Sequence, residues 1–211
     1  MKTLYVERST GECRSGDWVE KLDVEGVQRI VVGTGPGSFA GIRSALAFAQ
    51  GYALGAKCEV LGLPSPCAIA ADYFASTEQS NNRTIEQSNN RTIEQSNNRT
   101  IEQSNTSSVP LAVVGDARRG KFWIALFDGF KLICDVFQVE QDLLNLRVPL
   151  GVQVVSPDDK RIGPLLKETF GERYLGERLP TAEGLQRFAE ANPAILKTEP
   201  LPIYLNPAVR D

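Results

Sequence analysis

A glycine-rich turn, Gly-Thr-Gly-Pro-Gly-Ser at residues 33–38, follows a short apolar run and precedes small residues at helical spacing. Such a turn between a strand and a helix can hold phosphate, because backbone N–H groups and the helix N-terminus attract anions. Neither phosphate-binding pattern is complete here. The P-loop lysine is missing, the dinucleotide fingerprint breaks after its second glycine, and Pro36 has no N–H group. We therefore interpret the turn as structural, with Ser38 as the N-cap of the helix.

The sequence of 211 residues contains no histidine. Its absence excludes Ser–His and Cys–His nucleophile pairs and every imidazole metal ligand. The four cysteines, Cys13, Cys58, Cys67 and Cys134, form no Cys-x-x-Cys pair, so we expect reduced thiols. The sequence thus predicts no catalytic, cofactor-binding or metal-binding residue, and no cofactor.

Two charged turns remain as candidates for polar contacts. Asp116, Arg118 and Arg119 stand at the expected tip of a hairpin, where they could face a cleft or a partner. The alternative is an ordinary charged turn in which Asp116 caps local N–H groups. Asp158 and Asp159 are interpreted as part of a solvated charged turn, because paired carboxylates in a loop do not indicate acid–base catalysis without a cleft.

The overall composition argues against two classes of partner. The net charge is −3, from 23 basic and 26 acidic residues, so the chain is not expected to bind nucleic acid by itself. No run of eighteen apolar residues could form a membrane span, and the first residues are charged where a signal peptide is apolar. We expect a soluble, cytoplasmic protein without membrane contacts.

Hydrophobic patterning predicts an α/β chain with two halves of similar plan. Three copies of Glu-Gln-Ser-Asn-Asn-Arg-Thr-Ile at residues 78–101 separate the halves, and one Ile per octad cannot form a core. The expected domains are a first lobe (1–76), a flexible insertion (77–107) and a second lobe with a C-terminal tail (108–211). The expected strands are 2–7, 18–24, 29–33, 58–63, 109–117, 121–129, 131–139 and 152–159; the expected helices are 38–54, 64–75, 162–170 and 181–192.

Small residues run along two sides of the expected helix 38–54. Glycine costs about 1 kcal/mol relative to alanine in a helix, so its presence there favours close packing of another backbone. One side would cover the sheet, and the other would pack within the chain or against a partner. The candidate partner interface consists of Ala40, Arg43, Ser44, Ala47 and Gly51.

Three segments resemble motifs of the TsaB family, also called YeaZ. Residues 32–55, VGTGPGSFAGIRSALAFAQGYALG, resemble its GxGPGSFTGLRxGxxxAKGLA segment, and residues 116–128, DARRGKFWIALFD, resemble its DARRGEVYxALY hairpin. Residues 202–205, PIYL, resemble its closing PxYLR. The three matches occur in the same order as in the family, and the resemblance extends loosely over most of residues 28–205.

The resemblance implies an actin-like (ASKHA) fold of two ribonuclease-H-like lobes. It also implies a non-catalytic scaffold subunit that supports TsaD, which transfers a threonylcarbamoyl group to the adenosine next to the anticodon of tRNA. TsaD, the small ATPase TsaE and a second copy of the chain are the implied partners, and tRNA would be contacted only indirectly. The histidine pair of a TsaD-type metal site has no counterpart in this sequence.

Two departures from the family pattern leave alternatives open. Glu7 and Arg8 stand where the family's first turn has Asp and Thr, and the distance from there to the glycine-rich turn is short by about one strand and one helix. We therefore expect a shortened first lobe, and its ability to dimerise or bind TsaD stays open, as does any role of the octads. The alternatives are an ATP-binding ASKHA kinase or carbamoyltransferase of small molecules, or a decayed paralogue.

Overall fold

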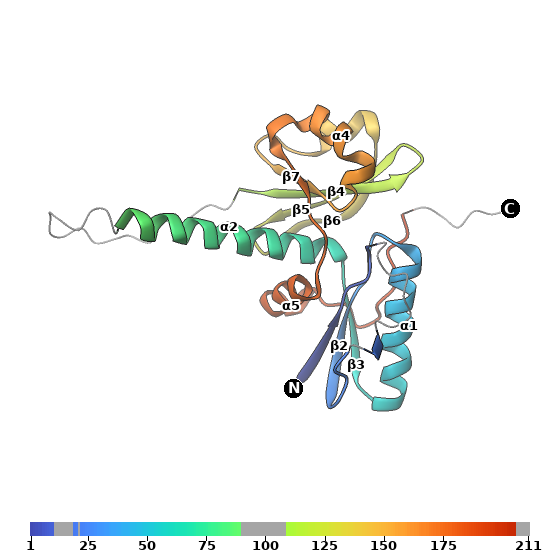
Figure 1. Cartoon of the computed structure of the whole chain (residues 1–211). Coiled ribbons are helices and arrows are strands. Elements are labelled where there is room, and N and C mark those ends of the chain that lie inside the picture. The colour runs from blue at the N-terminus through green and yellow to red at the C-terminus, as the bar shows by residue number, and fades with distance from the viewer. Residues whose placement is uncertain (11–18, 21, 90–108, 206–211) are drawn as a thin grey trace.

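The structure, a computed structural model, describes residues 1–10, 19, 20, 22–89 and 109–205. It contains two β-sheets, with helices α2 (Ser65–Asn89) and α5 (Ala182–Ala191) lying between them (Figure 1). The predicted mixed α/β fold with two sheets is confirmed. The predicted lobe boundaries at residues 76 and 108 stay a prediction, and residues 90–107 of the predicted insertion lie outside the described part of the chain.

The first sheet has three parallel strands in the order β1-β2-β3: β1 (Lys2–Val6), β2 (Val27–Gly33) and β3 (Glu59–Leu63). The central strand β2 is apolar and buried over its second half, as parallel strands covered on both faces usually are. Helix α1 (Phe39–Ala56) follows β2 and packs against β2 and β3. The predicted N-cap is confirmed, because the Ser38 hydroxyl accepts a hydrogen bond from the Gly41 N–H.

The second sheet has five strands in the order β6-β5-β4-β7-β8. An antiparallel meander of β4 (Leu111–Arg118), β5 (Lys121–Asp128) and β6 (Lys131–Glu140) is followed by α3 (Leu144–Arg147). Two parallel strands, β7 (Gln153–Ser156) and β8 (Tyr174–Glu177), extend the sheet beyond β4. Helix α4 (Asp159–Phe170) joins β7 to β8 and covers the outer face. Short 3-10 turns complete this part at Gln141–Leu143, Gly171–Arg173 and Pro193–Ile195.

Helices α2 and α5 join the two sheets through one continuous core. Leu63, Phe74, Phe127 and Phe188, from β3, α2, β5 and α5, belong to the same buried cluster. The helices approach so closely that a Cβ atom on Gly184 would lie 2.4 Å from the Ala68 carbonyl oxygen. Polar contacts reinforce the joint.

Those polar contacts centre on Asp72 of α2. The Thr181 hydroxyl donates to Asp72 Oδ2 at 2.5 Å, and Arg187 forms an ion pair with the same carboxylate. Thr181 also caps α5, as predicted, since it accepts the Gly184 N–H at 2.8 Å. The chain then returns to the first sheet, where Lys197 and Gly62 exchange two backbone hydrogen bonds at the outer edge of β3.

Several element predictions are wrong. Residues 19, 20 and 22–24 form no strand, and Leu22 packs on the core while the Tyr52 hydroxyl donates to the Val24 carbonyl at 2.5 Å. Side-chain anchors thus replace the expected ladder. Helix α2 does not end near residue 75 but continues to Asn89, into the first octads. Helix α3 and strand β8 were not predicted. Among the described residues, no helix is both long and apolar enough for a membrane span.

Candidate functional site

Helix α1 has one covered face and one uncovered face. The covered face packs on the first sheet through Gly41, Ile42, Ala45, Leu46 and Ala49. The five predicted interface residues share the other side of the helix: Ala40, Arg43, Ala47 and Gly51 are exposed, and Ser44 is half-buried. A Cβ atom on Gly51 would meet nothing within 4 Å, so packing inside the chain does not account for this glycine.

Apolar groups that the sequence did not single out extend this uncovered face at both ends of α1. Leu54 is 86% exposed near the C-terminal end. At the N-terminal end the Phe39 ring, 56% exposed, lies 5.4 Å from the Tyr204 ring, and the Arg43 guanidinium stacks over Phe39 at 4.9 Å. The exposure of Phe39 and Leu54 could not be predicted from the sequence, because single exposed apolar residues are common on protein surfaces. We define Ala40, Arg43, Ser44, Ala47 and Gly51, with Phe39 and Leu54, as the α1 face.

The glycine-rich turn packs against the turn that follows β1. Added Cβ atoms on Gly37 and Gly41 would lie 2.2 Å from the Ser9 carbonyl oxygen and 1.9 Å from the Arg8 carbonyl oxygen. The N–H groups of the turn also have protein acceptors: Thr34 donates to the Leu63 carbonyl, Gly35 to the Ser65 hydroxyl and Ser38 to the Ser9 carbonyl. Three N–H groups of the turn therefore have acceptors within the chain, and the close contacts give Gly37 and Gly41 a packing reason.

Glu7 lies in the turn that follows β1, and its carboxyl group is buried. The carboxyl accepts the Ser9 N–H at 2.7 Å and fills the space beside Gly33, where a Cβ atom would lie 1.9 Å from Glu7 Oε2. Burial raises the pKa of the Glu7 carboxyl above its usual value, against the opposing effect of hydrogen bonds from Ser9 and Ser65. The turn after β1 thus contains a buried acid.

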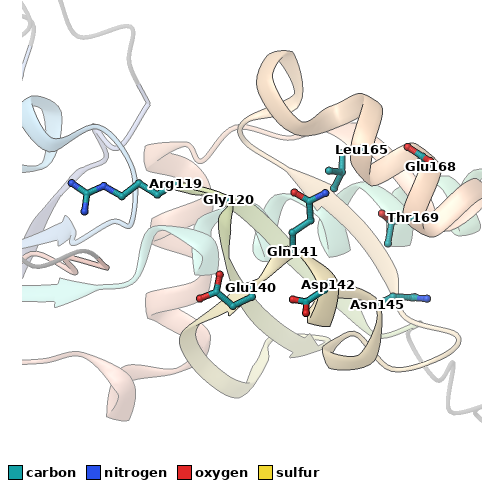
Figure 2. Close-up of a pocket in the computed structure, with 9 residues that line it drawn as sticks. All are labelled: Arg119, Gly120, Glu140, Gln141, Asp142, Asn145, Leu165, Glu168 and Thr169. Atoms are coloured by element: carbon teal, nitrogen blue, oxygen red, sulfur yellow. The ribbon is translucent and has the colours of Figure 1, made fainter.

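A cleft of about 900 Å³ opens between the two halves of the molecule. Asp116 and Arg118 line it, together with the start of α1 and the tail residue Tyr204. Arg119 does not: it borders a separate open hollow with Gly120, Glu140 and Glu168, and its side chain points away from the other residues of that hollow (Figure 2). The structure therefore brings two of the three predicted cleft residues together and separates the third.

Asp116 is held by its neighbours on both sides. It accepts the Arg118 N–H at 2.7 Å, as the charged-turn alternative requires, while its own N–H donates to Asp158 Oδ2 at 2.9 Å. Arg161 lies 3.2 Å from Asp116 Oδ2 and also pairs with Asp158. The prediction that the turn at 158–161 is merely solvated is therefore wrong, because the fold places Asp158 and Arg161 against the hairpin.

The described residues offer few groups for nucleophilic catalysis or metal binding. In the described part of the chain, Cys58, Cys67 and Cys134 are free thiols, and no three Cys, Asp or Glu side chains are grouped so that they could hold a metal ion. Tyr174 donates to Asp159 Oδ1 at 2.5 Å, and burial together with this hydrogen bond raises the pKa of the tyrosine. These contacts brace α4 against β8.

Comparisons with known proteins agree with this fold. Residues 19–82, which include β2, α1 and β3, match the model of the family described as TsaD, tRNA N6-adenosine threonylcarbamoyltransferase. No curated protein matches the sequence.

Two solved structures from Pseudomonas aeruginosa resemble most of the chain. One is described as an uncharacterized protein with similarity to peptidase YEAZ; it has a TM-score of 0.56 and 18% identity, over 85% of this chain and 74% of the other. The second is YeaZ, with a TM-score of 0.56 and 19% identity, over 88% of this chain and 78% of that chain. At these identities the likeness shows the fold, which is ASKHA-like. The TsaD-family match over residues 19–82 and the fold likeness to the two YeaZ-like structures both agree with the resemblance of this chain to the TsaB (YeaZ) family.

Proposed function

We propose that this chain is a cytoplasmic, non-catalytic scaffold subunit that supports a TsaD-like protein during threonylcarbamoylation of the adenosine next to the anticodon of tRNA. The observation that carries the proposal is the location of the α1 face. It lies within residues 19–82, the segment that matches the TsaD family; Ala40, Arg43, Ala47, Gly51 and Leu54 are exposed on it, and only its Phe39 end is touched by Tyr204.

The shape of the α1 face favours a protein partner. Ala47 and Gly51 project almost nothing from the helix, so another helix could approach its backbone closely. Leu54 and Phe39 provide apolar contact area at the two ends, and Arg43 provides a charge near the first turn. Small residues flanked by larger apolar ones fit a helix packed lengthwise along α1.

A scaffold role, rather than an enzymatic one, is favoured by the groups around the two turns. The N–H groups of Thr34, Gly35 and Ser38 are engaged within the chain, and a buried acid occupies the turn after β1. The Glu7 carboxyl also engages the Ser9 N–H, which removes one more backbone donor from that turn. Since the chain also has no histidine, the modified adenosine would be made by the TsaD-like partner.

We also propose that a TsaE-like ATPase joins this complex and that tRNA touches the chain only indirectly. The net charge of −3 is consistent with a subunit that does not bind tRNA by itself. This part of the proposal rests on the family resemblance.

An ATP-dependent enzyme is the second candidate, because Arg118, Lys160 and Arg161 line the cleft of about 900 Å³. Isothermal titration of the isolated chain with Mg-ATP separates the two functions. Saturable heat, followed by ATP turnover, would favour the enzyme, whereas no heat at millimolar ATP is expected for the scaffold.

The cellular test of the scaffold measures threonylcarbamoyladenosine in tRNA by nucleoside mass spectrometry after deletion of the gene. We expect the modification to fall and to return with the wild-type chain. Ala47→Leu, which places a bulky side chain on the α1 face, should fail to restore it. Ala191→Leu is the matched control, since Ala191 is also an exposed helical alanine, at the end of α5. Normal modification in the deletion strain would refute the proposal.

A further inference from the structure

Residues 197–205, which we call the tail strap, run from the outer edge of β3 across the glycine-rich turn. Lys197 and Gly62 of β3 exchange two backbone hydrogen bonds, of 2.8 and 3.0 Å. Further along, the Ile203 N–H donates to the carbonyl of Thr34, in the glycine-rich turn, at 2.9 Å. The tail strap is therefore tied both to the first sheet and to the turn that precedes α1.

The tail strap is also stiff and closely packed. Pro200 is buried, and a Cβ atom on Gly62 would lie 2.8 Å from the Pro200 Cβ atom. Pro200 and Pro202 fix their own φ angles and favour an extended conformation of the residue before each of them. The tail strap therefore loses little conformational freedom when it lies on the first sheet.

Tyr204 is held in place by both of its neighbours. Ile203 is fixed by its hydrogen bond to Thr34, and Leu205 packs against the core cluster that joins the two sheets. The Tyr204 ring, 51% exposed, consequently lies beside α1, with its centre 5.4 Å from the centre of the Phe39 ring. Two aromatic rings with tilted planes attract each other at this distance.

Phe39 and Arg43 form the N-terminal end of the α1 face. Phe39 is the first residue of α1 and its ring is 56% exposed, so the helix alone restricts the rotamer of this ring little. Arg43 lies one helical turn later on the same side of α1, and its guanidinium stacks over the Phe39 ring at 4.9 Å. The position of the Phe39 ring therefore determines where the charge of Arg43 lies.

We propose that Tyr204 is a positioning residue for the partner surface: it holds the Phe39 ring, and through this ring the Arg43 guanidinium, in the arrangement that the partner contacts. The inference rests on the proposed scaffold function and adds the tail strap to the α1 face. It also specifies the chemistry of the partner, which would pair a carboxylate with Arg43 and place an apolar side chain against the exposed parts of the two rings.

The benefit of holding these side chains before binding is entropic. A long side chain such as arginine loses conformational freedom when a partner orders it, and a guanidinium already stacked on a ring loses less. Without the Tyr204 ring, both Phe39 and Arg43 would have to be ordered during binding. Tyr204 therefore strengthens binding even where the partner does not touch it.

The first experiment tests the positioning in the isolated chain, without a partner. NMR spectra of the 23.1 kDa chain report the side-chain N–H signal of Arg43, which the Phe39 ring shifts and which Arg43→Lys identifies by its loss. Tyr204→Ala should move this signal toward that of an arginine in free solution. Leu201→Ala is the matched control, since Leu201 lies in the same tail strap and is 73% exposed, and it should leave the signal unchanged.

Hydrogen exchange of the Ile203 amide separates positioning from detachment of the tail strap. This amide should stay protected in Tyr204→Ala, because its acceptor is the Thr34 carbonyl. An unchanged Arg43 signal in Tyr204→Ala would overturn the proposal. Loss of protection at Ile203 would also overturn it, because the whole tail strap would then have detached.

The second experiment measures binding of the full chain to the TsaD-like protein of the same organism by isothermal titration. Tyr204→Ala should weaken binding by about tenfold, because the aromatic pair is lost. Tyr204→Phe, which keeps the ring, should restore the affinity of the wild type, and Leu201→Ala should bind as the wild type does. A role in overall stability alone would not give this pattern at a temperature where thermal unfolding shows every variant to be folded.

The outcomes of the titration separate this inference from the scaffold proposal. Binding of the wild type with equal affinity of Tyr204→Ala would overturn only the role of Tyr204. No binding of the wild-type chain would refute both the scaffold function and the partner contact proposed here.

Discussion

The two sheets share one plan but differ at one edge. In each, a first strand pairs in parallel with a second and the second with a third: β1-β2-β3 and β4-β7-β8. Helices α1 and α4 follow the equivalent second strands, and α2 and α5 follow the third strands. The second sheet adds β5 and β6 beside β4, whereas no described residue forms such a strand pair beside β1 (Figure 1).

The comparison of the two sheets shows which elements are needed to close the hydrophobic core. Helices α2 and α5 pack against each other and close one core across both sheets, although among the described residues only the second sheet has the antiparallel pair. The residues of β1 are less buried than those of β4.

The largest expected effect comes from the strand that only the second sheet has. Trp123 of β5 is 1% exposed, and its ring occupies the space beside Gly115, where a Cβ atom would lie 2.2 Å away. Trp123→Ala should lower the free energy of unfolding by about 3–5 kcal/mol. Leu4→Ala in the half-buried β1 should cost at most about 2 kcal/mol. Urea unfolding measures both, and equal losses would contradict the contrast between the sheets.

Two glycines should respond in opposite directions to the same substitution. Gly184→Ala forces a Cβ atom against the Ala68 carbonyl, so we expect a loss of about 1–3 kcal/mol of stability. Gly51→Ala adds a Cβ atom in open space on helix α1 and should gain about 0.5–1 kcal/mol. Thermal unfolding of both variants tests this. A destabilised Gly51→Ala chain would mean that the α1 face is already covered within the isolated protein.

A pH-dependent effect distinguishes the turn after β1. The folded-state pKa of Glu7 is raised by burial, so the folded chain holds this proton more tightly than the unfolded chain. The free energy of unfolding should therefore fall as the pH rises from the ordinary glutamate value of 4.5 through the raised value. Glu7→Gln removes this contribution. Denaturation curves over this pH range should show a smaller decline for Glu7→Gln, and parallel pH profiles would contradict the buried acid.

Much of the fold could be predicted because its signals are local. Apolar runs marked β2, β4 and β5, Ser38 and Thr181 marked two helix starts, and the turn at 118–120 joined β4 to β5. Strand β8 was not predicted, because Tyr-Leu-Gly-Glu is short and half exposed and forms a strand only by pairing with β7. The end of α2 was not predicted, because the polar octads show no apolar pattern of helical spacing.

The candidate site could be predicted only in part, for a related reason. Helical spacing separated two stripes of small residues along α1, and Ala47 and Gly51 are indeed uncovered. Asp116 and Asp158, which are in contact, lie 42 positions apart in the sequence, so no local pattern could predict this contact. Arg119 was grouped with Asp116 by sequence proximity, but the hairpin turn sends the two side chains to different surfaces.

The most direct test of the scaffold proposal mixes the purified chain with the TsaD-like protein of the same organism. Light scattering after size exclusion should show a stable complex that contains both proteins. The complex should form with Ala191→Leu and should be lost with Ala47→Leu, because only the second change alters the α1 face. If the chain elutes apart from the TsaD-like protein at every ratio, or if Ala47→Leu binds as well as wild type, the account of the α1 face is contradicted.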